Sequence, residues 1–169
     1  MSKIIYISGG QRSGKSSFAQ QMAEQLSTHP LYLATAHCWD EEFAERIKRH
    51  QADRGEHWSA VEEEVHLSHH DLSGRTVLMD CVTLWLTNIF AQHDYERDPS
   101  LTFAKSEWQR FIAQDFTLIV VSNEIGQGVI PMDKGTRAFV DLQGWMNQHI
   151  AATADEAYTL ISGIPLRIK

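Results

Sequence analysis

The most constraining feature of this sequence is a glycine-rich segment that directly follows an apolar run and precedes a helical pattern. Residues 9–16 read Gly-Gly-Gln-Arg-Ser-Gly-Lys-Ser and fit the pattern G-x-x-x-x-G-K-S without a mismatch. Lys3–Ser8 has the length and composition of a buried strand, and the spacing of Phe18, Met22 and Leu26 predicts one face of a helix. A strand, a loop and a helix in this order predict a phosphate-binding loop.

The residue types in this loop suit a polyphosphate. Glycines let the backbone curl so that successive N–H groups point inward, and the following helix adds the positive end of its dipole. We expect Lys15 to counter the β- and γ-phosphates and the Ser16 hydroxyl to bind Mg²⁺. A turn that merely connects a strand to a helix is disfavoured, because motif and context agree. The predicted nucleotide contacts are Gly9, Gly10, Gln11, Arg12, Ser13, Gly14, Lys15 and Ser16.

The rest of the chain alternates strand-like and helix-like segments. Further runs of strand length are continuously apolar, as in a parallel sheet covered on both faces, and lie at Leu31–Thr35, Thr76–Asp80, Thr117–Ser122 and Ala157–Ser162. A last short strand is expected near Leu166–Ile168. Segments long enough for crossover helices lie at Asp40–Gln51, Thr83–Phe90, Thr102–Gln114 and Asp133–Ala152. We predict a three-layer α/β fold of the P-loop NTPase type, with a doubly wound, mostly parallel sheet in a single domain spanning residues 1–169.

Composition narrows the functional classes. No apolar run approaches the roughly 20 residues that a membrane span requires, and the start of the chain lacks the pattern of a secretory signal. We therefore expect a cytoplasmic protein without membrane insertion. The formal net charge of -7 argues against nucleic acid as a partner. Cys38 and Cys81 are too few for a disulfide framework, so both are expected to be reduced and in or near the core.

A second carboxylate is expected to support the magnesium ion. Asp80 ends the apolar run Val77–Met79, and a carboxylate at the end of a strand neighbouring the loop would bind the metal directly or through water. An aspartate after a strand is often only a turn or a helix cap. The metal role of Asp80 therefore depends on the phosphate loop upstream.

The segment Asp40–Gln51 predicts a charged helix capped by Asp40, with Phe43, Ile47 and His50 on one face. His50 falls in its last turn, where a neutral imidazole could act as a nucleophile and a cationic adduct would be favoured by the helix dipole. From the residues alone, a solvated surface histidine is the commoner reading. Basic groups suited to phosphate surround it at Arg46, Lys48, Arg49 and Arg54.

His66, His69 and His70 have a spacing that could bring imidazoles together, which raises a metal site as a possibility. No nearby cysteine or carboxylate completes a persuasive set of ligands. The tryptophans are more typical of core or rim packing than of base stacking, and they carry no assignment.

Several segments, in order along almost the whole chain, together resemble one family. They are Gly9–Ser16, Leu33–Ala36, Arg46–His50, Trp58 with Glu62, Asp80–Asn88, Ser122–Pro131, Asn147–Gln148 and Ala154–Glu156. This set resembles the bifunctional adenosylcobinamide kinase/adenosylcobinamide-phosphate guanylyltransferase family of cobalamin biosynthesis. A phosphate loop alone would indicate only a superfamily, whereas the ordered set is specific to one family.

The resemblance implies two reactions on a small-molecule corrinoid. Adenosylcobinamide is phosphorylated on its aminopropanol hydroxyl with ATP or GTP, and GMP from GTP is then attached to that phosphate to give adenosylcobinamide-GDP. It implies His50 as the nucleophile that carries GMP, Mg²⁺ as the metal, and a homo-oligomer, specifically a trimer. The nucleotide contacts that it implies are Ala34, Thr35, Ala36, Gln51, Ala52, Asp53, Arg54, Glu62 and Asp80.

The sequence departs from the family pattern towards its end. Met132-Asp133 stands where Glu-Asn is common, Phe139-Val140-Asp141 stands in place of Phe-Arg-Asp, and Trp145 replaces a basic residue. These changes leave the nucleotide chemistry untouched and bear on the corrinoid contacts and on the kinase half.

Two other readings stay open at this point. One is an enzyme of narrower scope, either a guanylyltransferase without kinase activity or a P-loop kinase that acts on another hydroxyl. The other is a nucleotide-gated binding switch whose slow hydrolysis drives the exchange of partners. A GMP adduct on His50 would support the nucleotidyl route, whereas transfer of label only to free substrate would favour a simple kinase. A switch should show hydrolysis that depends on a partner and no modified corrinoid.

Overall fold

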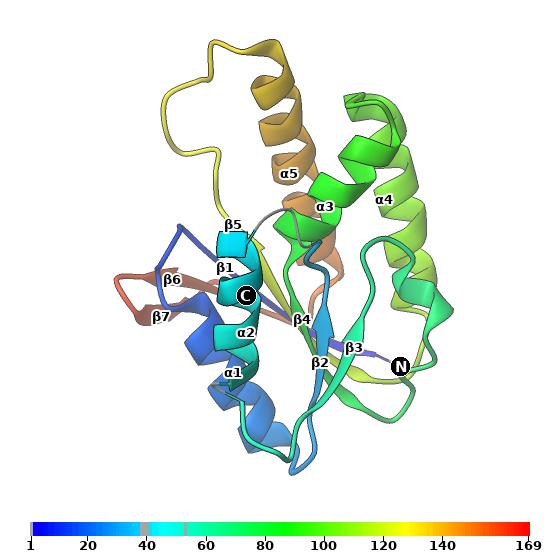
Figure 1. Ribbon diagram of the computed structural model, residues 1–169, viewed down its shortest axis with the longest axis vertical. Coiled ribbons are helices and arrows are strands. Elements are labelled where there is room, and N and C mark those ends of the chain that lie inside the picture. The colour runs from blue at the N-terminus through cyan, green and yellow to red at the C-terminus, as the bar shows by residue number, and fades with distance from the viewer. Residues whose placement is uncertain (1, 38–40, 53) are drawn as a thin grey trace.

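The computed structural model is a single twisted sheet of seven strands with helices on both faces (Figure 1). The structure describes residues 2–37, 41–52 and 54–169. The strand order is β3-β2-β4-β5-β1-β6-β7, and every neighbouring pair is parallel except β6 and β7. The strands are β1 Lys3–Gly9, β2 Leu31–Ala34, β3 Ser59–Glu62, β4 Thr76–Asp80, β5 Thr117–Asn123, β6 Glu156–Ile161 and β7 Ile164–Arg167.

The helices cover the sheet in two outer layers. One face carries α1 Lys15–Leu26, and α2 Glu41–Ala52 lies on the same side (Figure 1). The other face carries α3 Val82–Gln92, α4 Arg97–Phe111 and α5 Lys134–Thr153, with a short 3-10 turn, η1, at Leu67–His69. The predicted α/β class and the mostly parallel sheet are confirmed. None of the helices that the structure describes is long and apolar enough to cross a bilayer.

The sheet divides the core in two because successive side chains of each strand point to opposite faces. On β1, Ile4 and Tyr6 join the larger cluster under α3, α4 and α5, whereas Ile5 and Ile7 join the smaller cluster under α1. Trp85 and Trp108 are fully buried in the larger cluster.

Helix α1 packs on the sheet through small side chains. Ala19 and Ala23 are fully buried, whereas Leu26 is 47% exposed and Phe18 and Met22 only flank the cluster. The expected helix is present, and Phe18 and Met22 of its predicted apolar face pack beside the alanines, which make the main contact. Alanines at the contact let the helix backbone approach the centre of the sheet closely.

Two elements differ from the expectation. The short strand β3 was not predicted, because Ser59–Glu62 lies at an edge and is mostly exposed, so it lacks an apolar run. Helix α4 begins at Arg97 rather than near Thr102. Pro99 reads as a break in sequence, but in the first turn of a helix its missing N–H costs nothing.

The packing of α1 predicts a size limit at its contact face. Replacing Ala23 with Leu should destabilise the protein by about 1–3 kcal/mol, because extra methylene groups have no space at a fully buried position. Gln25→Leu, on the exposed side of the same helix, should change stability by less than about 0.5 kcal/mol. Urea unfolding of both variants checks this. Equal stability of the two variants would contradict the close packing of α1.

Candidate nucleotide-binding site

The phosphate loop leaves β1 at Gly9 and enters α1 at Lys15, and it is folded tightly. A Cβ at Gly9 would lie 2.5 Å from Ser13 Oγ and 2.9 Å from the Leu160 carbonyl oxygen, so only glycine fits there. Gly14 precedes α1 with a φ of 94°, in the left-handed region that favours glycine. The Gly163 N–H, in the turn between β6 and β7, donates to the Ser13 carbonyl at 2.8 Å. The hairpin thus supports the loop from one side.

Two polar groups inside the loop are arranged for an anion. Lys15 is only 7% exposed, and its Nζ donates to the Gly10 carbonyl at 2.6 Å across the loop. The hydroxyl of Ser13 is buried and has no hydrogen-bond partner within the described part of the chain. A buried hydroxyl left unpaired costs about 1–3 kcal/mol, so a phosphate oxygen here would be favoured. Ser16, in the first turn of α1, is half-buried.

Asp80 ends a strand, as expected, but not the strand next to the loop. Strand β5 lies between β1 and β4, so two strand spacings, about 10 Å, separate Asp80 from the β1 position. One carboxylate oxygen of Asp80 accepts a hydrogen bond from the Tyr32 hydroxyl at 2.9 Å. The Arg54 guanidinium lies 3.4 Å from the centre of the Tyr32 ring. Burial, with Asp80 beside it, raises the pKa of Tyr32, so its hydroxyl stays a neutral donor.

Thr35 joins the ends of β2 and β4. Its buried hydroxyl donates to the Cys81 carbonyl at 2.7 Å and accepts from the Cys81 N–H at 2.9 Å. Its carbonyl accepts from Asn88 at 2.8 Å. The hydroxyl of Thr35 is thus engaged within the protein, which leaves the half-buried Ala34 and Ala36 as the more open of these three positions. Burial raises the pKa of the Cys81 thiol to about 12, consistent with the expected buried thiol. Cys38 lies outside the described residues.

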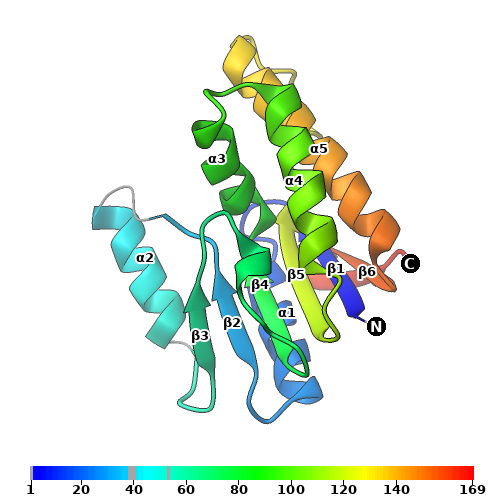
Figure 2. The ribbon, with the colours of Figure 1, turned by 90° about the vertical axis from the view of Figure 1, so that its right-hand side faces the viewer.

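The other predicted nucleotide contacts lie towards the far edge of the sheet. Glu62 ends β3 and is exposed, and β3 stands four strand spacings, about 19 Å, from β1. Helix α2 lies beyond β3 in Figure 2, away from β1. Ala52 is exposed at its end. The side chains of His50 and Gln51 lie outside the described part of the structure, as do Asp53 and the predicted cap Asp40.

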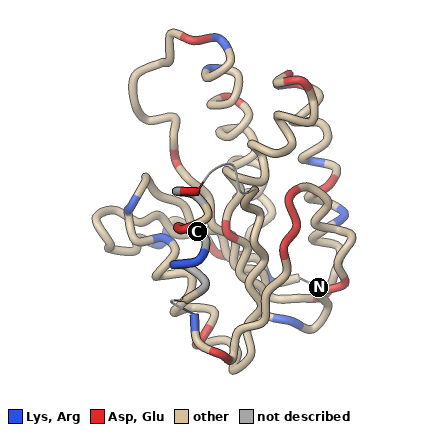
Figure 3. Tube along the Cα trace, viewed as in Figure 1, with Lys and Arg blue, Asp and Glu red and all other residues tan. Residues whose placement is uncertain are grey.

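The predicted residues therefore fall into two groups, and the second is not confined to the carboxyl edge, because α2 runs from that edge back towards the start of β3 (Figure 2). One group is the phosphate loop itself, and the other lies near β2, β3 and the end of α2. Asp80 stands between them. An acidic run, Glu62–Glu64, begins at the last residue of β3, at the far edge of the sheet (Figure 3).

The sheet order also reveals polar residues that were assigned no role from sequence. At the end of β5, Ser122 donates to Asn147 at 2.6 Å, and Gln143 donates to both, all three being buried. Asn123 donates through its side chain to the Thr83 hydroxyl at 3.0 Å. Apart from Gln143, these residues lie in segments that carry the family resemblance, but only the position of β5 beside β1 brings the end of β5 next to the loop.

Glu124 follows β5 and is held against the loop. Its N–H donates to the Gly9 carbonyl at 2.9 Å. Burial, together with the negative charge of Glu124, raises the pKa of Tyr6 to about 12. The backbone of Glu124 thus lies beside the first residue of the phosphate loop, and its carboxylate is close enough to Tyr6 to affect the pKa of that side chain.

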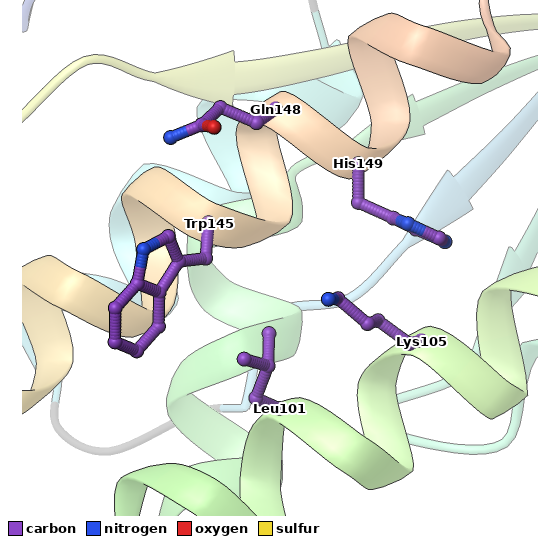
Figure 4. Close-up of a pocket in the computed structure, with 5 residues that line it drawn as sticks. All are labelled: Leu101, Lys105, Trp145, Gln148 and His149. Carbon is purple, nitrogen blue, oxygen red and sulfur yellow. The ribbon is translucent and has the colours of Figure 1, made fainter.

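Two other features lie away from this edge. The rings of His66 and His69 stack at 4.7 Å and His70 contacts Glu63 at 3.1 Å, and no group of three metal-binding side chains occurs among the residues the structure covers. A groove of about 450 Å³ lies between α4 and α5 (Figure 4). It is lined by Leu101, Lys105, Trp145, Gln148 and His149.

The loop geometry and the sheet order define a nucleotide-binding protein with a P-loop NTPase fold. A solved ATPase from the type III secretion system of pathogenic bacteria has the same fold, with a TM-score of 0.59 and 10% identity over 94% of this chain. The chain spans about half the length of that ATPase, 51%.

The particular family follows from comparison of the sequence. Residues 5–168 match the family described as CobU, cobinamide kinase / cobinamide phosphate guanyltransferase, and the chain belongs to it. The bifunctional adenosylcobalamin biosynthesis protein CobU of Escherichia coli K12 is 35% identical over 98% of this chain and 99% of its own. The bifunctional adenosylcobalamin biosynthesis protein CobP of Pseudomonas aeruginosa is 36% identical, over 96% of this chain and 95% of its own. CobU of Salmonella typhimurium is 32% identical, over 98% of this chain and 99% of its own. The resemblance seen in the sequence is confirmed.

The tight fold of the loop predicts a contrast between two adjacent glycines. Gly9→Ala should weaken GTP binding at least about tenfold, or about 1.4 kcal/mol, because the new Cβ meets backbone at Leu160 and forces the loop off the hairpin. Gly10→Ala should lose much less, since nothing lies within 4 Å of its Cβ position. Calorimetric titration with GTP measures both. A loss that is equal in the two variants would contradict this account of the loop.

Proposed function

We propose that this chain catalyses both reactions named by its family: phosphorylation of adenosylcobinamide with ATP or GTP, and transfer of GMP from GTP to the resulting phosphate. The observation that carries the proposal is the phosphate loop, with its buried Lys15 and unpaired Ser13 hydroxyl, in a chain that matches the family from residue 5 to 168. The corrinoid is the acceptor and the nucleoside triphosphate is the donor. The whole chain, residues 1–169, acts as one catalytic domain.

The phosphate loop holds the β- and γ-phosphates in both reactions. Backbone N–H groups of residues 9–16 and the N-terminus of α1 bind the phosphate oxygens, and Lys15 balances their charge. Its side chain is already held across the loop by Gly10, so little freedom is lost on binding. The Ser13 hydroxyl gains the partner that it lacks within the protein.

Ser16 and Asp80 fit a magnesium ion. Both supply oxygen, the ligand type that Mg²⁺ prefers, and Mg²⁺ usually keeps several waters and bridges to phosphates. Tyr32 holds one oxygen of Asp80 and leaves the other for the metal or one of its waters. When bound, the ion neutralises charge on the transferring phosphate.

His50 carries GMP between the two substrates. Its attack on the α-phosphorus of GTP and the later attack of the corrinoid phosphate divide one transfer into two displacements. A cationic adduct at the last turn of α2 is stabilised by the negative end of the helix dipole. The exposed Lys48 and Arg49 lie in the same turn.

A nucleotide that extends from the phosphate loop along the carboxyl edge of the sheet would meet the predicted contacts at the ends of β2 and β3. Its phosphates would lie at the loop, and its nucleoside would extend towards Ala34–Ala36 and Glu62. The segment 51–54 begins at the end of α2 that lies away from this edge, so a contact with it is proposed on the family resemblance alone. Arg54 packs on the ring of Tyr32, and the Tyr32 hydroxyl donates to Asp80. These contacts connect the segment after α2 to the proposed metal site. A homotrimer in the cytoplasm completes the proposal, on the strength of the family resemblance.

One assay tests the two activities together. We expect the protein, supplied with adenosylcobinamide, GTP and Mg²⁺, to form both adenosylcobinamide phosphate and adenosylcobinamide-GDP, detected by mass spectrometry. The phosphate alone would indicate a simple kinase, and conversion only of added adenosylcobinamide phosphate would indicate a guanylyltransferase. If neither product forms with folded protein, the proposal is wrong, and hydrolysis that depends on a partner would indicate a switch.

Replacing His50 should separate the two steps. With His50→Asn, incubation with labelled GTP should leave no acid-labile GMP on the protein, and adenosylcobinamide phosphate should accumulate, because phosphorylation does not use the imidazole. His29→Asn, at an exposed position after α1, serves as the control and should keep the label. A GMP adduct that persists in His50→Asn would assign the nucleophile to another residue.

A further inference from the structure

Glu124 directly follows β5, the strand that lies beside the start of the phosphate loop. Strand β5 is the direct neighbour of β1, and its last residue, Asn123, is in register with Gly9. The next residue, Glu124, donates its N–H to the Gly9 carbonyl at 2.9 Å. The backbone of Glu124 is therefore fixed to the first residue of the phosphate loop.

The carboxylate of Glu124 is oriented as well. Its Oε1 accepts a hydrogen bond from the Gly126 N–H at 2.9 Å. A Cβ at Gly126 would lie only 3.3 Å from the same oxygen, so glycine lets the carboxylate lie close against the backbone. Glu124 is half-buried, and its second carboxylate oxygen accepts no hydrogen bond from the residues that the structure describes. One carboxylate oxygen is thus held by the Gly126 N–H, and the other can accept a proton from a substrate.

The structure limits the direction from which an acceptor can reach the loop. On one flank the β6–β7 hairpin packs against it through Gly163 and Ser13. On the other flank the loop 124–133 rises from the end of β5 (Figure 1). This loop begins with Glu124 and carries exposed apolar side chains at Val129, Ile130 and Met132. An acceptor that arrives over this flank passes Glu124 first.

Asp80 is less suited to the same task. It lies one strand further from the phosphate loop, and one of its oxygens is held by Tyr32. A magnesium ligand also gives electron density to the metal, which makes it a weaker proton acceptor. The two carboxylates at this edge therefore have different positions and suit different roles.

We propose that Glu124 is the general base of the phosphorylation reaction, a role that rests on the proposed function of the chain. As the acceptor's hydroxyl oxygen forms a bond to the γ-phosphorus, the bond from that phosphorus to the β–γ bridging oxygen breaks. The nucleoside diphosphate leaves with the electron pair of that bond. The hydroxyl proton passes to the open carboxylate oxygen of Glu124 and from there to solvent. The guanylyl transfer has no such need, because its acceptor is an ionised phosphate.

The two reactions of one protein make this role testable. In Glu124→Gln, phosphorylation of adenosylcobinamide by ATP should fall at least about 100-fold in kcat, the usual contribution of a positioned base, with the KM for ATP little changed. The same preparation, given adenosylcobinamide phosphate and GTP, should form adenosylcobinamide-GDP at close to the wild-type rate. Glu96→Gln, an exposed glutamate next to α4, is the matched control and should keep both rates.

Each other outcome overturns the proposal. Unchanged phosphorylation in Glu124→Gln would show that the carboxylate accepts no proton. An equal loss of both reactions, with an unchanged melting temperature, would show that Glu124 shapes the loop instead. A rise in the Mg²⁺ concentration needed for half-maximal rate would make it a metal ligand. A wild-type protein that forms neither product would instead contradict the proposed function itself.

Discussion

The structure depends on one close approach, where the backbone at Gly9 passes against Ser13 and Leu160. Because no Cβ intervenes, the chain can leave β1, fold back over its own end and start α1 at Lys15. The turn of the β6–β7 hairpin fills the space behind it, through the hydrogen bond from Gly163. The phosphate loop is therefore held by three strands, β1, β5 and β6, rather than by its own residues alone. A loop supported in this way loses little freedom when it binds an anion.

Strand β5 lies between β1 and β4, and this strand order sets how far each side chain at the carboxyl edge lies from the phosphate loop. Side chains at the ends of parallel strands meet at one edge, and their distance from the loop is set by strand order. Glu124 comes after the adjacent strand and Asp80 ends the next one, so two carboxylates belong to this edge at two distances from the phosphate loop. A third position, Thr35, is used to join β2 to β4. The phosphate loop, Glu124, Asp80 and Thr35 thus follow one another along one edge of the sheet.

The sequence predicted the elements well and their neighbours poorly. Continuous apolar runs and the loop motif located β1, β2, β4, β5 and β6, because burial on both faces leaves a strong pattern. β3 was missed because an exposed edge strand has no such pattern. Strand order depends on long-range packing that no local spacing encodes, so Asp80 was predicted next to the loop and Glu124 received no role. Likewise, the alanine contact of α1 was hidden, since Ala19 and Ala23 are equally typical of an exposed helix.

A chain with a net charge of -7 can still bind a polyphosphate, because the relevant interactions act at short range. Charges separated by more than about 8 Å are largely screened at physiological ionic strength. The acidic run Glu62–Glu64 lies near β3, about 19 Å from the β1 position, so its repulsion at the loop is weak. Lys15 and the backbone N–H groups instead act at contact distance in a partly buried site, where electrostatic interactions are stronger. The overall charge thus argues against a long anion such as nucleic acid more strongly than against a small anion at the loop.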